Sequence, residues 1–461
     1  MNLSSVIRRV ATATLTPLAL LAGVDALAPS PAVAAGYRPG VVIVGYSTPQ
    51  VAAFAADVAN RHGVRESAPA ATAETRVVRV PRGLSVAQEI DRLRHQPGVA
   101  YAVPDYLAHV AGSQAGWIPN DRGKAGAAQG WQRMQWNFLS AAGVNAPRAW
   151  SNLFAVHRGG AKGVVVAVLD TGVAYRNWHQ FRRSPDFART RFASPYDFVA
   201  GNRYPLDREG HGTFVTGVIA ESTNNGLGLT GLAYGATIMP VRVLDANGFG
   251  DAATISKGIR YAATHGAQVI NLSLEFDPSV TANDIPDILS AIRFAHDRGV
   301  VVVGASGNEG DTEIAYPARD TDAISVGATT LDRCLADYSN GGAKLDLVAP
   351  GGGDDASLPN EPSCHPGRSL PDVYQMTFND PSRPARFSFP GGWYGTSMAA
   401  PEVSAGAAMV IASGVIGRRP TPKQILGRLE STAQTLGGTK PNDNYGYGLL
   451  DVGAATSRSV P

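Results

Sequence analysis

The stretch Val164-Val165-Val166-Ala167-Val168-Leu169-Asp170-Thr171-Gly172 decides the fold class of this chain. Six apolar residues run without interruption into a carboxylate and a glycine-containing turn. A continuous apolar run of this length is typical of a short strand that is buried on both faces. Such strands belong to parallel sheets that helices cover on both sides, so we expect an α/β domain around it.

Further segments of the same kind follow along the chain, and helical patterns separate them. We predict strands over residues 237–244, 269–274, 300–303 and 323–328, and helices over 252–265, 285–298, 396–414 and 421–433. Because buried strands alternate with helices, we expect a three-layer domain over residues 131–461, in which a parallel sheet lies between helices.

The first 35 residues have the pattern of a secretory signal peptide. Arg8 and Arg9 supply positive charge, an apolar stretch covers residues 10–28, and Ala32-Val33-Ala34 gives the small residues that signal peptidases accept. The alternative interpretation is an Ala-rich leader without a targeting role. We expect export, and thus a secreted, extracellular protein.

Residues 36–111 are predicted to form a small α+β unit of the ferredoxin-like kind. Strand patterns cover 41–44, 75–80 and 99–103, and helical patterns cover 49–61 and 85–95. This order suits a split βαβ sandwich. The segment 112–130 is polar and rich in Gly, Ala and Gln, so we expect a linker there.

Composition excludes several classes of partner. The 461 residues have a net charge of +2 and no long basic run, which gives no reason to expect nucleic acid. No segment after the leader reaches the roughly 20 apolar residues of a membrane anchor.

In an exported protein the two cysteines, Cys334 and Cys364, favour a disulfide over two free thiols, and they have no zinc-site spacing.

Four polar residues stand where a strand ends or a helix begins, which is where sites gather in open α/β sheets. They are Asp170, His211 (flanked by Gly210 and Gly212), Asn308 and Ser397. Each has an ordinary structural reading on its own: a turn aspartate, a structural histidine, a turn asparagine and an N-cap serine. The serine would lie at a helix N-terminus, where free backbone N–H groups stabilise negative charge.

Together these segments resemble the subtilisin-like serine peptidases over about residues 131–455. The motifs that carry the resemblance are Val168-Leu169-Asp170-Thr171-Gly172, Gly210-His211-Gly212-Thr213, Ser306-Gly307-Asn308 and Gly395-Thr396-Ser397-Met398-Ala399-Ala400-Pro401. The resemblance implies that Ser397 is the nucleophile, that His211 is its base and that Asp170 orients the imidazole. Asn308 and the Ser397 N–H would stabilise the oxyanion.

The same resemblance implies a binding cleft for polypeptide substrates. An extended peptide would add as a strand between Gly248-Phe249-Gly250 and Ser273-Leu274, and Ala305-Ser306-Gly307 would line a side-chain pocket. The alternative reading for all eight residues is ordinary strand packing.

The N-terminal unit resembles the family's inhibitory propeptide, which would be cut off near Ala111; a permanent accessory domain is the alternative. We therefore expect a secreted, monomeric serine endopeptidase made as an autoprocessed zymogen. A catalytically inactive peptide-binding relative is the competing hypothesis. An esterase of the α/β-hydrolase type is disfavoured because its serine comes first in the chain and here it comes last.

The sequence departs from the family pattern at two acidic residues. Glu402 follows Ala399-Ala400-Pro401 where His is usual, and an extra carboxylate there could raise the pKa of the histidine. Glu275 follows Ser273-Leu274 where Gly is usual; pointing into the cleft it would favour basic substrates or hinder some side chains.

The chemistry itself requires no cofactor, but many relatives hold structural calcium. Asp186 and Asn224-Asn225 lie in segments that resemble one such site. We therefore expect a structural calcium ion but assign no ligands to it.

Overall fold

The computed structural model describes residues 37–53, 66–68, 74–106, 116–124, 126–359 and 361–458. The chain forms two compact units that divide between Gly112 and Ser113, and each is considered by itself. The expected signal peptide, most of the helix expected over 49–61 and the expected cut at Ala111 lie outside the described residues. None of the described helices is both long and apolar enough to cross a membrane.

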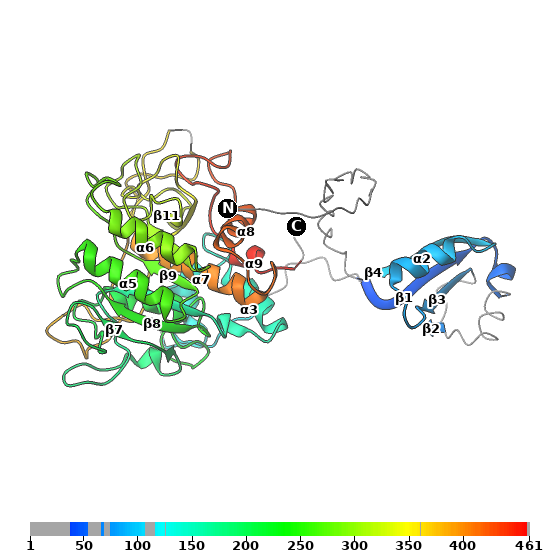
Figure 1. Ribbon diagram of the computed structural model, residues 1–461, viewed down its shortest axis with the longest axis horizontal. Coiled ribbons are helices and arrows are strands. Elements are labelled where there is room, and N and C mark those ends of the chain that lie inside the picture. The colour runs from blue at the N-terminus through cyan, green and yellow to red at the C-terminus, as the bar shows by residue number, and fades with distance from the viewer. Residues whose placement is uncertain are drawn as a thin grey trace, which may run out of the picture. The chain divides into compact units, whose positions relative to one another are not determined.

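The N-terminal unit is a four-stranded sheet with a helix on it (Figure 1). Its elements are β1 (Tyr37–Tyr46), β2 (Glu66–Ala68), β3 (Thr75–Arg79), α2 (Val86–Arg94) and β4 (Val99–Tyr106), with strand order β2-β3-β1-β4. Ser85 and Gln88 form a capping box that starts α2. The α+β prediction is confirmed for this unit; the three-residue strand β2 had no sequence signal.

The second unit is built on an eight-stranded sheet whose strand pairs are all parallel. The order is β12-β11-β10-β9-β5-β8-β6, and β7 pairs with β8. The strands are β5 (Val165–Asp170), β6 (Arg191–Phe192), β7 (Tyr196–Asp197), β8 (Thr237–Arg242), β9 (Val269–Leu272), β10 (Val301–Ala305), β11 (Ala323–Thr329) and β12 (Leu347–Pro350). The predicted parallel sheet is confirmed.

Helices cover both faces of this sheet, and two side-by-side helices, α5 and α6, lie on one of them (Figure 1). The α-helices are α3 (Ala146–Ala155), α4 (His211–Ala220), α5 (Ala252–Thr264), α6 (Pro286–His296), α7 (Thr396–Ser413), α8 (Pro422–Thr432) and α9 (Val452–Ala455). Short 3₁₀ turns occur at η1 (Gly130–Arg133), η2 (Trp136–Phe138), η3 (Gly159–Ala161) and η4 (Pro185–Phe187).

The alternation of side chains along β5 explains why this strand is apolar throughout. Val166 and Val168 pack in one core cluster with side chains of α4 and α7. Ala167 and Leu169 point the other way and pack in a second cluster with α5 and α6. Because both faces of the strand are buried, every position from Val166 to Leu169 must be apolar.

Residues 112–130 were expected to form a linker, but the part of this range that the structure describes packs on the second unit. Trp117 packs edge-on against Trp150 of α3, with ring centroids 5.8 Å apart. Asp121 is fully buried and accepts hydrogen bonds from the backbone N–H groups of Asn224 and Asn225. The segment from residue 116 onward is therefore part of the second unit, because its aromatic and acidic side chains find partners there.

Candidate active site

Asp170 and His211 meet where β5 ends and α4 begins. Asp170 is buried, and its Oδ1 accepts hydrogen bonds from Thr171 N at 2.7 Å and from His211 Nδ1 at 2.8 Å. A side chain at Gly212 would collide with the carbonyl of Gly172 and would lie 3.0 Å from Asp170 Oδ1. Glycine at this position therefore lets the helix start approach the strand end closely enough for the pair to form.

Asp207, which the sequence reasoning missed, joins these two elements. Its Oδ1 accepts from Thr171 Oγ1 at 2.9 Å and from Gly210 N at 2.9 Å, and its Oδ2 accepts from Thr213 N at 2.8 Å. Asp207 is buried, so these bonds are shielded from water. An Asp three residues before a Gly at a helix start is an Asx-type turn signal that could have identified it.

The charges around His211 favour its protonated form. Burial opposes that form, but the carboxylate of Asp170, with smaller contributions from Glu209 and Asp207, outweighs it and raises the pKa of His211 to about 9. Glu209 also accepts a hydrogen bond from His211 N at 2.6 Å. Three carboxylates therefore increase the basicity of the imidazole in this site.

Ser397 is the second residue of α7 and lies against the end of β9. Its Oγ donates to the carbonyl of Ser273 at 3.3 Å, and Ser273 Oγ donates back to the Ser397 carbonyl at 2.8 Å. Because β9 pairs with β5, Ser273 and Asp170 follow neighbouring strands at the same edge of the sheet. Trp393, four residues before Ser397, stacks on Phe214 of α4, which ties the serine segment to the histidine helix.

Asn308 follows β10, the next strand of the sheet. Both the oxygen and the nitrogen of its side-chain amide form hydrogen bonds. Its Oδ1 accepts from Thr396 N at 2.8 Å and from Thr396 Oγ1 at 3.1 Å. Its Nδ2 donates to Glu275 Oε1 at 3.0 Å. Since a primary amide carries two N–H groups, one remains to donate to a ligand. The four predicted residues therefore follow or adjoin three adjacent strands, β5, β9 and β10.

Comparison with known proteins identifies the family of both parts of the chain. Residues 161–448 match the subtilase family, Peptidase_S8, and residues 26–105 match the fervidolysin N-terminal prodomain. This chain belongs to the subtilase family.

Individual subtilases match over long segments. A thermophilic serine proteinase of Bacillus sp. strain AK1 is 34% identical over 362 residues, which cover 78% of this chain and 74% of the relative. Subtilisin Savinase of Lederbergia lenta is 37% identical over 298 residues, 64% of this chain and 91% of the relative. A solved Pseudoalteromonas arctica protease has a TM-score of 0.59 at 29% identity and covers 74% of this chain and 99% of its own. The chain is thus a subtilisin-like serine endopeptidase with an N-terminal prodomain.

Two of the three segments expected to bind substrate in this subtilase adjoin Ser397 and its helix. Ser273 contacts Ser397 as described, and Gly307 N donates to Thr396 Oγ1 at 3.4 Å. The side chain of Leu274 is buried in the core cluster under α5 and α6, so a substrate could reach only its backbone. Ala305 and Ser306 are also buried, and Ser306 Oγ donates to the carbonyl of Asn340.

The third segment, Gly248-Phe249-Gly250, forms a tight turn beyond β8. The Asp245 carboxylate accepts from Phe249 N at 3.0 Å, and Gly248 has a φ of +82° that favours glycine. The Phe249 side chain is 77% exposed. Val243 N and Leu244 N donate to the carbonyl of Asp170, so the segment that leads into this turn lies beside the candidate aspartate.

Glu402 does not act on His211. Its side chain is fully buried in α7, where Oε1 accepts from Asn137 Nδ2 at 2.6 Å. It is absent from the groups that shift the histidine pKa. The idea that this carboxylate raises the basicity of the site is therefore wrong: Glu402 is buried on α7 and its carboxylate is paired with Asn137.

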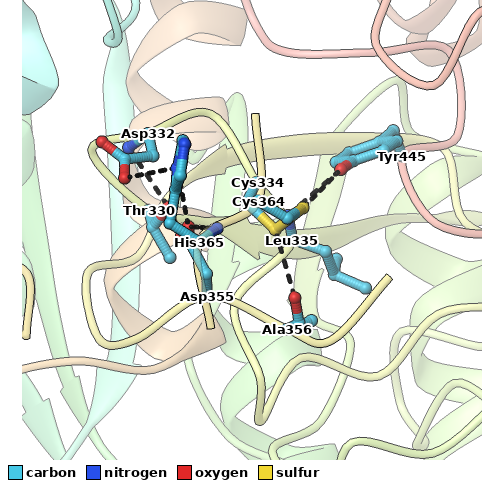
Figure 2. Close-up of a disulfide and its surroundings, with 9 residues drawn as sticks. All are labelled: Thr330, Asp332, Cys334, Leu335, Asp355, Ala356, Cys364, His365 and Tyr445. Atoms are coloured by element: carbon cyan, nitrogen blue, oxygen red, sulfur yellow. Dashed lines mark hydrogen bonds and ion pairs between the residues drawn. A yellow bond between two sulfur atoms is a disulfide. The ribbon is translucent and has the colours of Figure 1, made fainter. Parts of the chain in front are cut away.

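The expected disulfide between Cys334 and Cys364 is present (Figure 2). Beside it Asp355 accepts from Thr330 Oγ1 and from His365 N at 2.6 Å, while His365 Nδ1 lies 3.2 Å from Asp332 Oδ2. The cross-link joins the loop before β12 to the loop after it, and these polar contacts support the same region.

Proposed function

We propose that Ser397, His211 and Asp170 form the catalytic triad of this endopeptidase, with Asn308 as an oxyanion donor. The observation that carries the proposal is the Asp170–His211 hydrogen bond at the edge of the sheet where α7 presents Ser397. Asp170 would fix the imidazole tautomer, with the proton on Nδ1, and would stabilise the imidazolium that forms. Asp207 would act as a positioning residue that keeps the two elements together.

The reaction proceeds through an acyl-enzyme. Ser397 Oγ turns from Ser273 toward the imidazole, gives its proton to His211 Nε2 and bonds to the scissile carbonyl carbon. The resulting oxyanion accepts from the free N–H of Asn308 Nδ2 and from Ser397 N at the start of α7. His211 then passes the proton to the leaving amine as the C–N bond breaks. Water adds by the same route and releases the acid.

A serine-directed phosphonate probe tests the assignment. We expect it to label Ser397, as located by peptide mass, and to leave Ser397→Ala unlabelled. Asn308→Ala should label more slowly and lose about 10²–10³ in kcat, because one oxyanion donor is gone. A folded protein that shows no labelling would favour the inactive peptide-binding alternative.

The protein is further proposed to be secreted and to process itself. The signal-like leader and the disulfide support export, since disulfides persist in oxidising compartments. The prodomain match supports synthesis as a zymogen whose N-terminal unit inhibits the enzyme. Its substrates would be polypeptides bound as an added strand between Gly248–Gly250 and Ser273–Leu274, and the enzyme would act as a monomer.

A structural calcium ion is proposed near Asp121 and Asp186. Asn225 bridges these two buried carboxylates: its N donates to Asp121 and its Nδ2 donates to Asp186 at 2.9 Å. Nearby Glu221 is fully buried, and its Oε2 has no hydrogen-bond partner. No basic side chain forms an ion pair with any of the three in the described part of the chain. These hard oxygen donors suit calcium, which would supply the missing positive charge.

A further inference from the structure

Glu275 lies directly beside the proposed oxyanion donor. It is the third residue after β9, two residues beyond Ser273, whose carbonyl accepts from the Ser397 hydroxyl. Its Oε1 accepts from Asn308 Nδ2 at 3.0 Å, while its Oε2 is buried without any hydrogen-bond partner. A carboxylate oxygen withdrawn from water and left without a partner is costly, so the Glu275 carboxylate is stabilised by any cation that substrate binding brings beside it.

The surroundings of Glu275 are short of positive charge. Within the described residues no Lys, Arg or His forms an ion pair with it. Glu309, on the Asn308 loop, adds a second carboxylate, whose Oε2 accepts from Asn308 N at 3.0 Å. Burial, opposed by the Asn308 hydrogen bond and reinforced by the charge of Glu309, raises the pKa of Glu275. This part of the cleft therefore favours a cation.

Geometry places such a cation on one particular substrate residue. The oxyanion must lie about 3 Å from Asn308 Nδ2, and Glu275 Oε1 lies 3.0 Å from the same atom. The two oxygens are then within about 6 Å of each other. The residue that owns the attacked carbonyl has its Cα one bond from the reacting carbon, so its side chain is the one that can reach Glu275.

We propose that Glu275 makes the enzyme selective for substrates with Lys or Arg at the residue whose carbonyl is attacked. This inference rests on the proposed function of Ser397 and Asn308. An unneutralised carboxylate this close to the oxyanion repels the charge that develops in the transition state. A Lys ammonium or an Arg guanidinium beside the Glu275 carboxylate removes that repulsion, so it lowers the free energy of the transition state as well as that of the bound substrate.

The test compares peptides that differ only at this residue: Lys, its neutral near-isostere norleucine, and acetyl-lysine. We expect the wild-type enzyme to prefer Lys over norleucine by about 10- to 100-fold in kcat/KM. Glu275→Gln keeps an acceptor for Asn308 but removes the charge, so the preference should fall to near unity. The matched control is Glu313→Gln, which should keep the preference. Glu313 is an exposed carboxylate on the loop after β10 that also carries Asn308, and it pairs with Arg319 at 2.6 Å.

The pH dependence of the preference gives a second readout. The titration of His211 affects the cleavage of the Lys and norleucine peptides equally, so it cancels in the ratio of their kcat/KM values. This ratio should rise as Glu275 ionises, and Glu275→Gln should leave it flat. Glu309 is the other titratable group that acts on Glu275, so Glu309→Gln should move the rise to lower pH without abolishing it.

Two results would overturn the inference while leaving the proposed function intact. One is a wild-type enzyme that Ser397-directed phosphonate labels but that cleaves Lys and norleucine peptides equally. The other is a Glu275→Gln enzyme that slows on both peptides by the same factor, which would make Glu275 only a positioning residue for Asn308. Absence of labelling and of any hydrolysis would instead refute the proposed function.

Discussion

At the scale of single residues, the site depends on how carboxylates are placed around one imidazole. Asp170 bonds to Nδ1 of His211, and Glu209 bonds to its backbone N. Both stabilise the imidazolium, which the reaction forms transiently. The same charges raise the pKa of the imidazole to about 9, so the neutral fraction that can accept a proton grows as the solution becomes alkaline.

The activity should therefore rise with pH up to alkaline values. Burial lowers the pKa of His211, and the nearby carboxylates outweigh it to give about 9. Only the neutral imidazole can accept the serine proton, so kcat/KM should climb as the pH approaches 9. Glu209→Gln keeps the acceptor for His211 N but removes one charge, so the ascending limb should move to lower pH.

The measurement is kcat/KM for one neutral peptide between pH 5 and 11, which reports the free enzyme. Asp297→Asn, an exposed carboxylate at the end of α6, is the control and should leave the limb in place. An unchanged limb in Glu209→Gln would refute the role given to this carboxylate.

The residues that perform the proposed chemistry could be named from the sequence, whereas those that hold them could not. Asp170, His211, Asn308 and Ser397 stand in short motifs with unusual glycine content. Asp207 acts through contacts with Thr171 and Thr213, and Glu209 acts through the backbone N–H of His211; only the folded chain shows these contacts. The direction of Glu402 likewise depends on Asn137, which is 265 residues away in the chain.

At the scale of elements, α7 carries a buried polar pair behind the nucleophile. Glu402 Oε1 accepts from Asn137 Nδ2, while Glu402 Oε2 and Asn137 Oδ1 have no partner. Burial raises the pKa of Glu402 well above its ordinary value, against the Asn137 hydrogen bond. The two unpartnered atoms become complementary once the carboxyl carries a proton, because its O–H can then donate to the amide oxygen.

Glu402→Gln should consequently stabilise the protein at high pH but not at low pH. As the pH rises past the ordinary Glu value, the unfolded chain loses this proton and the folded chain keeps it, so wild-type stability falls by about 1.4 kcal/mol per pH unit. Gln cannot ionise and escapes this loss.

Thermal unfolding of both proteins at pH 4 and pH 8, in a Ser397→Ala background that prevents autolysis, measures the effect. Asp297→Asn serves as the surface control. A difference in Tm that is the same at both pH values would show that folding does not raise the pKa of Glu402.

The element boundaries show where sequence patterns stop being informative. The largely apolar pattern over 269–274 predicts a strand to its end, but β9 stops at Leu272 because the carbonyl and the hydroxyl of Ser273 both bond to Ser397. The helix α3 and the strand β12 were not predicted. The strand is only four residues long, but α3 does have apolar residues at helical spacing (Ala146, Ala149, Trp150 and Leu153), a signal that was overlooked. Buried strands with continuous apolar runs were predicted within one or two residues.

At the scale of the whole molecule, buried charge in the peptidase unit should make stability depend on calcium. Removing calcium with a chelator should lower Tm, and restoring it to 100 times its dissociation constant should return about 2.7 kcal/mol. Asp186→Asn should lose most of this response, whereas Asp297→Asn should keep it. The measurement is calorimetric unfolding with and without calcium in the Ser397→Ala background. Equal Tm values in chelator and in millimolar calcium would contradict the site.

The central claim is that Ser397 is the nucleophile of a subtilase that removes its own prodomain. The most direct test follows the intact mass over time of the chain beginning at Gly36, alongside its Ser397→Ala variant. We predict that the first loses about 76 residues, which corresponds to a cut after Ala111, and that the variant stays whole unless active enzyme is added. If the variant matured alone at the same rate, or if both stayed whole and the trimmed protein took no phosphonate label, the claim would be contradicted.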